Sequence, residues 1–356
     1  MWIRTGVMVV LLAAGCSKRE ERAPKPVEPV SARDAAEAPV DDIAALRATM
    51  EEREAADDDV AAAAAGDKLV AQLRERKLTG EPSFASTLEA YALVLRASGR
   101  WADAEPVLRE ALELPQGKTD AVLRSSLLFQ LGAVYMEQRR NEDAIPLLLE
   151  SLELSEKEHG ADSIAAMNTI ESLASVYDYV DRYPEAEVLF RRALKLAEVH
   201  HGAGSEQVGR VLTNLALNLS FQKRFDQALA MYKRAIPLLA ASKGYERSSL
   251  AEAHSGIGGV HHERKKLALA EASYVRARAV REEALGLEHP LIAMDDHNLA
   301  VVLADQNKLG AALEACIRSE SLRAKTLAAD HPHRLETEEL CTRIGAAVNR
   351  PLKRRK

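Results

Sequence analysis

The sequence predicts an all-α protein built as an array of helix-turn-helix units, and two ladders of small residues carry this prediction. One ladder is a row of alanines separated by 40, 42, 42, 42 and 42 residues: Ala104, Ala144, Ala186, Ala228, Ala270 and Ala312. The other lies twelve residues before each of these, at Ala92, Gly132, Ala174, Ala216, Gly258 and Ala300. A phase kept over five intervals indicates a repeated structural unit, and repeat arrays usually provide binding surfaces.

Each half of the repeat has the pattern of an amphipathic helix, because apolar residues recur at three- and four-residue steps around both ladders. A bulky or apolar residue follows four positions after each second-ladder alanine: Leu108, Leu148, Phe190, Tyr232, Tyr274 and Cys316. Small residues at matched heights let two antiparallel helices approach closely, and the bulky residue fills the space between them. Strand signals are absent, with 4% aromatic residues and no Asn-Gly or Asp-Gly dipeptide.

The first fifteen residues have the pattern of a signal peptide. Arg4 precedes an uncharged stretch from Thr5 to Gly15, which is shorter than the roughly 20 residues that span a bilayer. Ala13-Ala14-Gly15-Cys16 then resembles a bacterial lipobox, and this resemblance implies that Cys16 is lipidated and becomes the mature N-terminus. A misassigned start or an uncleaved anchor remain the alternatives. The same resemblance implies sorting to the outer membrane, because Ser17 and not an aspartate follows the cysteine.

Residues 16–40 have no apolar periodicity and contain four prolines, so we expect a disordered tether rich in Pro, Ala and charged residues. Residues 41–80 should be helical and hold a degenerate repeat, because Ala62 lies 42 residues before Ala104. Six repeats follow over residues 81–332. Pro237 falls inside a predicted helix, which it should kink or end early. A lone capping helix over residues 333–348 and a basic tail over residues 349–356 complete the chain.

Several segments resemble the tetratricopeptide repeat in its 42-residue, kinesin light chain-like form. They include Thr213-Asn214-Leu215-Ala216, His297-Asn298-Leu299-Ala300 and the Leu-Gly-x-x-His-Pro signature of residues 285–290, with a second His-Pro at residues 331–332. The resemblance implies a right-handed superhelix of about six helix-turn-helix repeats plus a capping helix. It also implies a concave groove, lined by the first helix of each repeat, that binds an extended peptide or a protein surface.

Helical geometry predicts which side chains line this groove. If the first-ladder residue packs inward, positions three and six before it and four after it point along the groove. These positions are mostly polar, which predicts a solvated groove. The residues selected are Glu89, Phe129, Asn168, Glu171, Asp178, Arg210, Thr213 and His297. Asn214 and Asn298 match the family asparagine that hydrogen-bonds a peptide backbone, although a solvated or capping role is the alternative.

The sequence gives no indication of chemistry at an active site. The formal charge of −6 does not suggest nucleic-acid binding, and no catalytic, phosphate-binding or dinucleotide motif is present. His254 and His261 share a helix face but lack a third ligand at helical spacing, so we expect no metal, no cofactor and no small-molecule substrate. Cys316 and Cys341 should be packing residues, and a disulfide between them is open at this point.

These patterns together predict a non-enzymatic scaffold for protein–protein interaction. Its partners would be a protein or peptide in the groove and the membrane, through the N-terminal lipid. Its location would be the periplasmic side of the bacterial cell envelope, with the outer membrane favoured. The alternative is a structural subunit of an envelope assembly, such as a secretion, pilus or outer-membrane biogenesis machine.

Overall fold

The computed structural model describes residues 43–56, 58–242 and 247–349, and every regular element in these ranges is a helix. The predicted signal peptide, Cys16, the tether and residues 350–356 of the basic tail lie outside the described residues. No helix in the described ranges is long and apolar enough to cross a membrane.

The chain divides into two compact units, and the division falls inside α10 (Tyr183–His201). The described part of the N-terminal unit is residues 43–56 and 58–189, and that of the C-terminal unit is residues 190–242 and 247–349. The N-terminal unit contains α2 (Ile43–Ala55), α3 (Asp59–Glu75), the 3-10 turn η2 (Leu78–Gly80), α4 (Ser83–Ala97), α5 (Trp101–Glu113), α6 (Pro115–Thr119), α7 (Ala121–Glu137), α8 (Asn141–His159) and α9 (Ile164–Tyr179). The C-terminal unit contains α11 (Glu206–Phe221), α12 (Phe225–Leu239), α13 (Ser248–Glu263), α14 (Leu267–Leu285), α15 (Pro290–Asp305), α16 (Leu309–Thr326) and α17 (Pro332–Val348).

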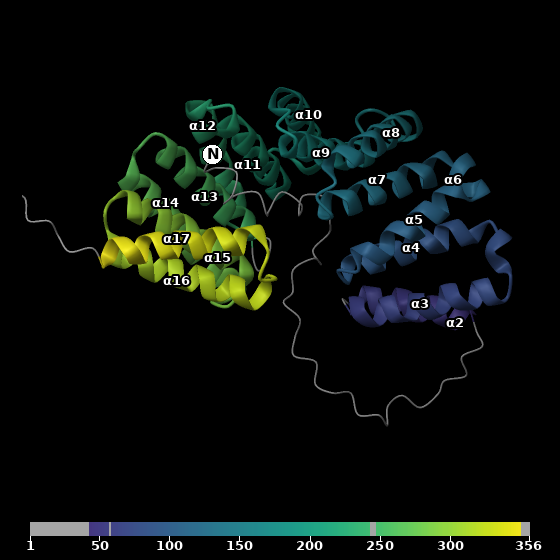
Figure 1. The fold of residues 1–356 in the computed structure, drawn as a ribbon. Helices are drawn as coiled ribbons and strands as arrows, with labels where there is room; N and C mark the ends of the chain where they lie inside the picture. Colours follow the sequence, from purple (N-terminus) through teal and green to yellow (C-terminus); the bar gives the residue numbers. More distant parts are fainter. Residues whose placement is uncertain (1–42, 57, 243–246, 350–356) are drawn as a thin grey trace, which may run out of the picture. The chain divides into compact units, whose positions relative to one another are not determined.

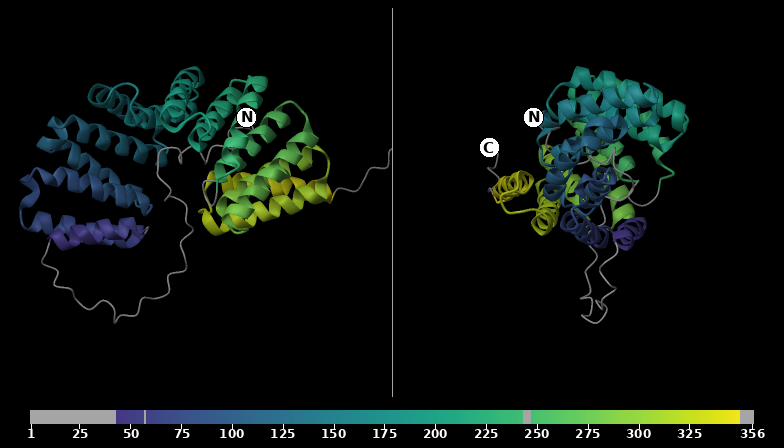
Figure 2. Two further views of the ribbon diagram at one scale, coloured as in Figure 1. Left: turned by 180° about the vertical axis from the view of Figure 1, so that it is seen from behind. Right: turned by 90° about the vertical axis from the view of Figure 1, so that its right-hand side faces the viewer.

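Within each unit, consecutive helices pack as pairs. In the N-terminal unit the pairs are α2–α3, α4–α5 and α7–α8, and in the C-terminal unit they are α11–α12, α13–α14 and α15–α16 (Figures 1 and 2). The first helix of one pair also contacts the first helix of the next, as in α4–α7 and α11–α13. The predicted all-α, helix-turn-helix architecture is therefore confirmed.

Both ladders are buried in every repeat, which confirms that they mark the contact between paired helices. Gly132 illustrates the closeness of this contact, because a Cβ atom at this position would lie 2.9 Å from Leu148 Cδ2. Leu148 is one of the bulky residues that follow the second ladder, and all of these are buried as well. Small residues thus set the helix separation, and large residues fill it.

The turn inside each pair places one residue in the left-handed region. These residues are Gly99 (φ 77°), Arg139 (60°), Asp181 (63°), Lys223 (60°), Lys265 (58°) and Asn307 (61°). Only the first is a glycine, although a left-handed conformation costs an ordinary residue about 1–2 kcal/mol. Backbone hydrogen bonds to the end of the preceding helix close this turn, as from Arg140 N to Tyr135 O at 2.8 Å.

The Leu-Gly-x-x-His-Pro signature starts a helix. Gly286 has φ 85° and ψ 163°, a conformation that is essentially restricted to glycine. His289 is the N-cap of α15, where its Nδ1 accepts a hydrogen bond from the backbone N–H of Leu291 at 3.3 Å, and Pro290 begins the helix. His331 and Pro332 repeat the arrangement at α17, where Nδ1 accepts from His333 N at 3.2 Å.

Two irregularities interrupt the repeat. Helix α12 ends at Leu239, two residues after Pro237, and has 15 residues where α8 and α14 have 19, as the prediction of an early end required. The short helix α6 occupies the connection between Ala104 and Ala144, where the ladder step is 40 instead of 42. The sequence analysis did not predict α6 as a helix.

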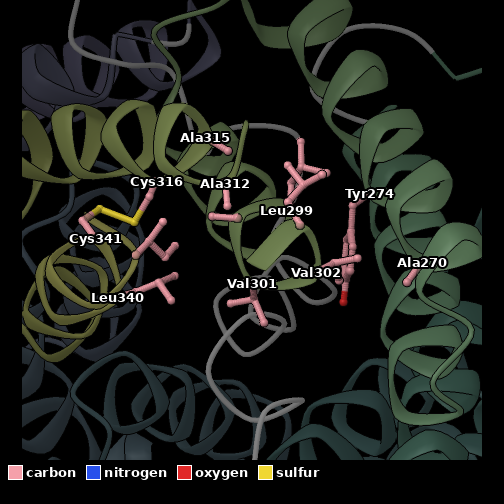
Figure 3. Packing of buried hydrophobic residues seen from close by; sticks show 13 residues of the cluster. Ala270, Tyr274, Leu299, Val301, Val302, Ala312, Ala315, Cys316, Leu340 and Cys341 are labelled. Carbon is pink, nitrogen blue, oxygen red and sulfur yellow. A yellow bond between two sulfur atoms is a disulfide. The ribbon is translucent and has the colours of Figure 1, made fainter. Parts of the chain in front are cut away.

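The last helix, α17, closes the C-terminal unit. Leu340 and Ile344 of α17 join the core formed by α14, α15 and α16 (Figure 3). A disulfide connects Cys316 of α16 to Cys341 of α17, with the two Cα atoms 5.5 Å apart. Both cysteines are buried, as predicted for packing residues. The structure contains the disulfide that the sequence left open.

Candidate partner-binding surface

Within each unit, one stripe of the first helices stays mostly open when the repeats pack. It consists of the positions six and two before the first-ladder residue and five after it. Successive helical residues are rotated by about 100°, so these positions lie at about 120°, 160° and 140° from the ladder residue, on one face. The partly or fully exposed members are Ser86, Ala90, Ala97, Ser126, Glu137, Asn168, Ser172, Tyr179, Arg210, Phe221, Glu252, Glu263, Asn298 and Asp305. We call this set the open stripe.

Four of the predicted groove residues stand at open-stripe positions. Asn168, Arg210 and Asn298 are half-buried, whereas Asn214 is buried, with 7% of its surface exposed, so the prediction of an open position is wrong for Asn214. Asn298 Nδ2 is buried and has no hydrogen-bond partner among the described residues. An amide that keeps an unused donor at the edge of an open face is suited to a backbone carbonyl of a partner.

The prediction of an open position is wrong for Glu171, Asp178, Thr213 and His297. Their exposed fractions are 1%, 5%, 4% and 2%. Positions three before and four after the ladder residue lie at about 60° and 40° from it, close to the buried side of the helix. Their polarity is therefore a property of the helix contacts and does not indicate a solvated groove.

Contacts in the C-terminal unit show what these positions do. His297 Nδ1 lies 3.0 Å from Thr337 Oγ1, which joins α15 to α17. At the equivalent position of α13, Ser255 Oγ donates to Asp295 Oδ1 at 3.2 Å. Four residues after the ladder, His262 Nε2 lies 2.7 Å from Asp305 Oδ2. These side chains connect successive first helices by hydrogen bonds.

In the N-terminal unit the same row is partly open. Glu89 of α4 and Phe129 of α7 are half-buried, and Leu93, four residues after Glu89, is 40% exposed. Glu89 accepts hydrogen bonds from Ser126 Oγ and from Gln130 Nε2, the latter at 3.5 Å. Burial raises the pKa of the Glu89 carboxyl, although these two hydrogen bonds act to lower it.

The sequence analysis missed a buried ionic cluster in the C-terminal unit. Arg281 of α14 pairs with Asp295 of α15, and Asp296 beside it accepts hydrogen bonds from Arg278 and Arg318. Adjacent aspartates next to a family motif were a visible signal. Their partners lie on two other helices, so no local spacing rule identifies them.

Nothing in the described residues forms a metal site, because no group of three or more His, Cys, Asp or Glu side chains comes together. His254 and His261, which share a face of α13, are only half-buried. Desolvation lowers the pKa of both imidazoles, and the positive charge of Arg276 adds to this at His254.

Comparison with known proteins identifies the family to which this chain belongs. The sequence matches the tetratricopeptide repeat family over residues 87–122, 123–199, 173–241, 250–291 and 297–333. These matches cover more than half of the chain, which therefore belongs to the tetratricopeptide repeat family. No curated protein sequence matches this chain.

Solved structures share the fold at low sequence identity. RapI in its apo form is 16% identical and has a TM-score of 0.62, covering 80% of this chain and 98% of that chain. The quorum sensor NprR from B. thuringiensis, in its apo form, is 15% identical with a TM-score of 0.62, covering 87% of this chain and 84% of that chain. NprR in complex with its cognate peptide NprX is 13% identical with a TM-score of 0.58, covering 86% and 84%. A putative kinesin light chain from Podosopora anserina is 17% identical with a TM-score of 0.48, covering 58% and 96%.

Proposed function

We propose that this protein is a lipid-anchored scaffold that binds an extended peptide, or the surface of another protein, along the open stripe. The observation that supports this proposal is the stripe itself, a row of side chains on the first helices of each unit that remain accessible when the repeats pack. The NprR structure with its cognate peptide supports the peptide class, because it has the same fold. Tetratricopeptide arrays generally act as interaction scaffolds rather than as enzymes.

Asn214 and Asn298 are the residues that we assign to backbone recognition. They occupy the same repeat position on α11 and α15, with Gly256 at the equivalent place on α13. An amide offers one acceptor and two donors, which matches the alternating C=O and N–H groups of an extended chain. Gly256 itself is buried against Tyr232, and Arg210 adds one cation to the same stripe.

Recovery of partners from detergent-solubilised cells tests this proposal. Asn214→Ala, Asn298→Ala and Arg210→Ala in one variant should lose the partners that the unmodified protein recovers. A matched variant with Lys233→Ala and Arg276→Ala changes exposed residues on the second helices α12 and α14 and should keep them. Equal recovery by both variants would remove the open stripe as the binding surface.

The anchor is a separate part of the proposal and rests on residues 1–16. Labelled palmitate should be incorporated into the unmodified protein and not into a Cys16→Ala variant, which should also leave the membrane fraction. Labelling and fractionation unchanged by Cys16→Ala would show that Ala13-Ala14-Gly15-Cys16 is not a lipidation signal. The same fractionation, with inner and outer membranes separated, tests the outer-membrane preference.

A structural subunit of an envelope assembly is the second candidate. Its supporting observation is a set of exposed apolar side chains on the second helices. Val188 and Val199 on α10 are 67% and 77% exposed, and Leu269 and Val275 on α14 are 50% and 49% exposed. If the protein is such a subunit, Leu269→Ser with Val275→Ser should release it from its complex, while the Asn214, Asn298 and Arg210 variant should not.

A further inference from the structure

Charge is distributed unequally between the two units. The described residues of the N-terminal unit contain 15 Lys and Arg against 27 Asp and Glu, a formal charge of −12. Those of the C-terminal unit contain 21 against 18, a formal charge of +3. A field of this strength around the N-terminal unit favours the approach of a cationic partner over an anionic one.

On the open face of α4 and α7, part of this negative charge lies at the carboxyl group of Glu89. At the open-stripe positions of the two helices no basic residue occurs, and the side chains are Ser86, Ala90, Ala97, Ser126, Gln130 and Glu137. Glu89 lies beside them, half-buried, and both of its hydrogen-bond partners, Ser126 and Gln130, are neutral. The charge of Asp120, which is negative, also acts on it and raises the pKa of its carboxyl group.

Gln130 adds a second acceptor at this place. The residue is 6% exposed, and its Nε2 points to Glu89 Oε1 at 3.5 Å. Its Oε1 is buried and accepts no hydrogen bond from the described residues. A buried acceptor without a donor costs about 1–3 kcal/mol, so a ligand that brings a donor gains from it. A group with several N–H donors and a positive charge would therefore satisfy both residues, because it could pair with the Glu89 carboxylate and donate a hydrogen bond to Gln130 Oε1.

Apolar surface surrounds the two acceptors. Leu93 lies one helical turn after Glu89 and is 40% exposed, and Phe129 precedes Gln130 and is half-buried. Lysine and arginine combine an apolar stem with a charged end, and such side chains place the stem along apolar surface. An ammonium has three donors and a guanidinium five, enough to reach both acceptors.

We propose that Glu89 and Gln130 form a subsite that takes a lysine or arginine side chain of the bound partner, with Leu93 and Phe129 contacting its aliphatic stem. The partner is thus a segment in which a basic residue stands among apolar ones. This inference rests on the proposed function, because it names the ligand class for the open stripe of the N-terminal unit. It adds a residue-level preference that the asparagines of the C-terminal unit do not provide.

Small probes test the subsite without knowledge of the partner. The full-length protein, with its glutamine side chains labelled with ¹⁵N, is titrated with n-butylammonium, n-butylguanidinium or n-butanol. We expect both cations to shift the Gln130 side-chain amide resonance saturably, and n-butanol to bind at least fivefold more weakly. Equal affinity for n-butanol would overturn the proposal, as would an unmoved Gln130 resonance.

Two variants separate a local contact from the general field. Glu89→Gln keeps the size of the side chain and should weaken n-butylammonium binding at least fivefold. Glu142→Gln removes the same charge from an exposed position on α8 and should change it less than twofold. Equal effects of the two variants would show that only the overall charge acts. Unchanged partner recovery by the asparagine variant would overturn the proposed function but would leave this titration unaffected, so the two proposals fail independently.

Discussion

Arg281 and Asp295 form a salt bridge in the interior of the C-terminal unit, with Arg281 Nη1 2.5 Å from Asp295 Oδ2 and both side chains fully buried. Burial raises the pKa of Asp295, while the positive charge of Arg281 and the hydrogen bond from Ser255 lower it. The pair joins α14 to α15, and Ser255 extends it to α13. One ion pair thus connects two successive repeats.

Removal of one partner of this pair should strongly destabilise the protein. Arg281→Met leaves Asp295 buried without its cation, which typically costs about 3–5 kcal/mol. Denaturant unfolding measures the loss. Arg318→Met is the matched control, because Arg318 is 44% exposed and Asp296 keeps Arg278 as a partner, so its cost should stay below about 1 kcal/mol. A cost of Arg281→Met as small as that of the control would contradict the structural role of the pair.

Two glycines of α13 should respond in opposite ways to the same substitution. A Cβ at Gly256 would lie 2.2 Å from Tyr232 Oη, whereas a Cβ at Gly259 would meet Tyr274 Oη at an ordinary 3.6 Å. Gly256→Ala should therefore cost about 1–3 kcal/mol through overpacking. Gly259→Ala should be neutral or stabilise by up to about 1 kcal/mol, since alanine favours the helix.

A second-site change checks the cause of the Gly256 effect. Tyr232→Leu places at this position the residue that Leu108 and Leu148 provide in other repeats. The cost of Gly256→Ala in the Tyr232→Leu background should be smaller than in the parent protein. An unchanged cost would mean that the tyrosine is not the obstacle.

Acid should weaken the attachment of α17. Burial and the nearby charge of Arg323 lower the pKa of His297 to about 4, although Glu336 acts in the opposite direction. The unfolded chain has a pKa near 6.5 at this residue, so the unfolded state binds more protons between these values. The contribution of neutral His297 is complete above about pH 6.5 and is lost as the pH falls toward 4.

Unfolding midpoints between pH 7 and pH 4.5 measure this dependence. A His297→Asn variant should show a weaker dependence than the parent protein, with His254 responsible for part of the remainder because its pKa is also lowered. Parallel pH profiles for the two proteins would assign the acid sensitivity to other groups.

Reduction of the disulfide should destabilise the C-terminal end. Cys316 and Cys341 are 25 residues apart, and closing a loop of this size contributes about 3 kcal/mol on the chain-entropy estimate. Dithiothreitol should therefore lower the unfolding midpoint of the parent protein and make α17 a site of early proteolysis. A Cys316→Ala, Cys341→Ala variant should be insensitive to the reductant. If dithiothreitol lowers both midpoints equally, the bond does not support the cap.

The sequence predicted the contacts inside a helix pair more accurately than the contacts between pairs. Ala216, Gly258 and Tyr274 are buried where the ladders require, because a small residue at a fixed period reports directly on the facing helix. Thr213 and His297 were assigned to an open groove and are buried. Both residues stand three positions before the ladder residue, at about 60° from it and close to the buried side of the helix, and their polar side chains were mistaken for a sign of exposure. Asn298 was assigned through family resemblance and lies on the open stripe.

The disulfide between α16 and α17 should make the C-terminal end of the chain more resistant to local opening than the N-terminal end. In a repeat array, opening starts most easily at an end and spreads inward. The bond keeps Cys316 and Cys341 together at one end, whereas no disulfide joins α2 to α3 among the described residues. Hydrogen exchange in an oxidising medium should therefore be slower in α16 and α17 than in α2 and α3.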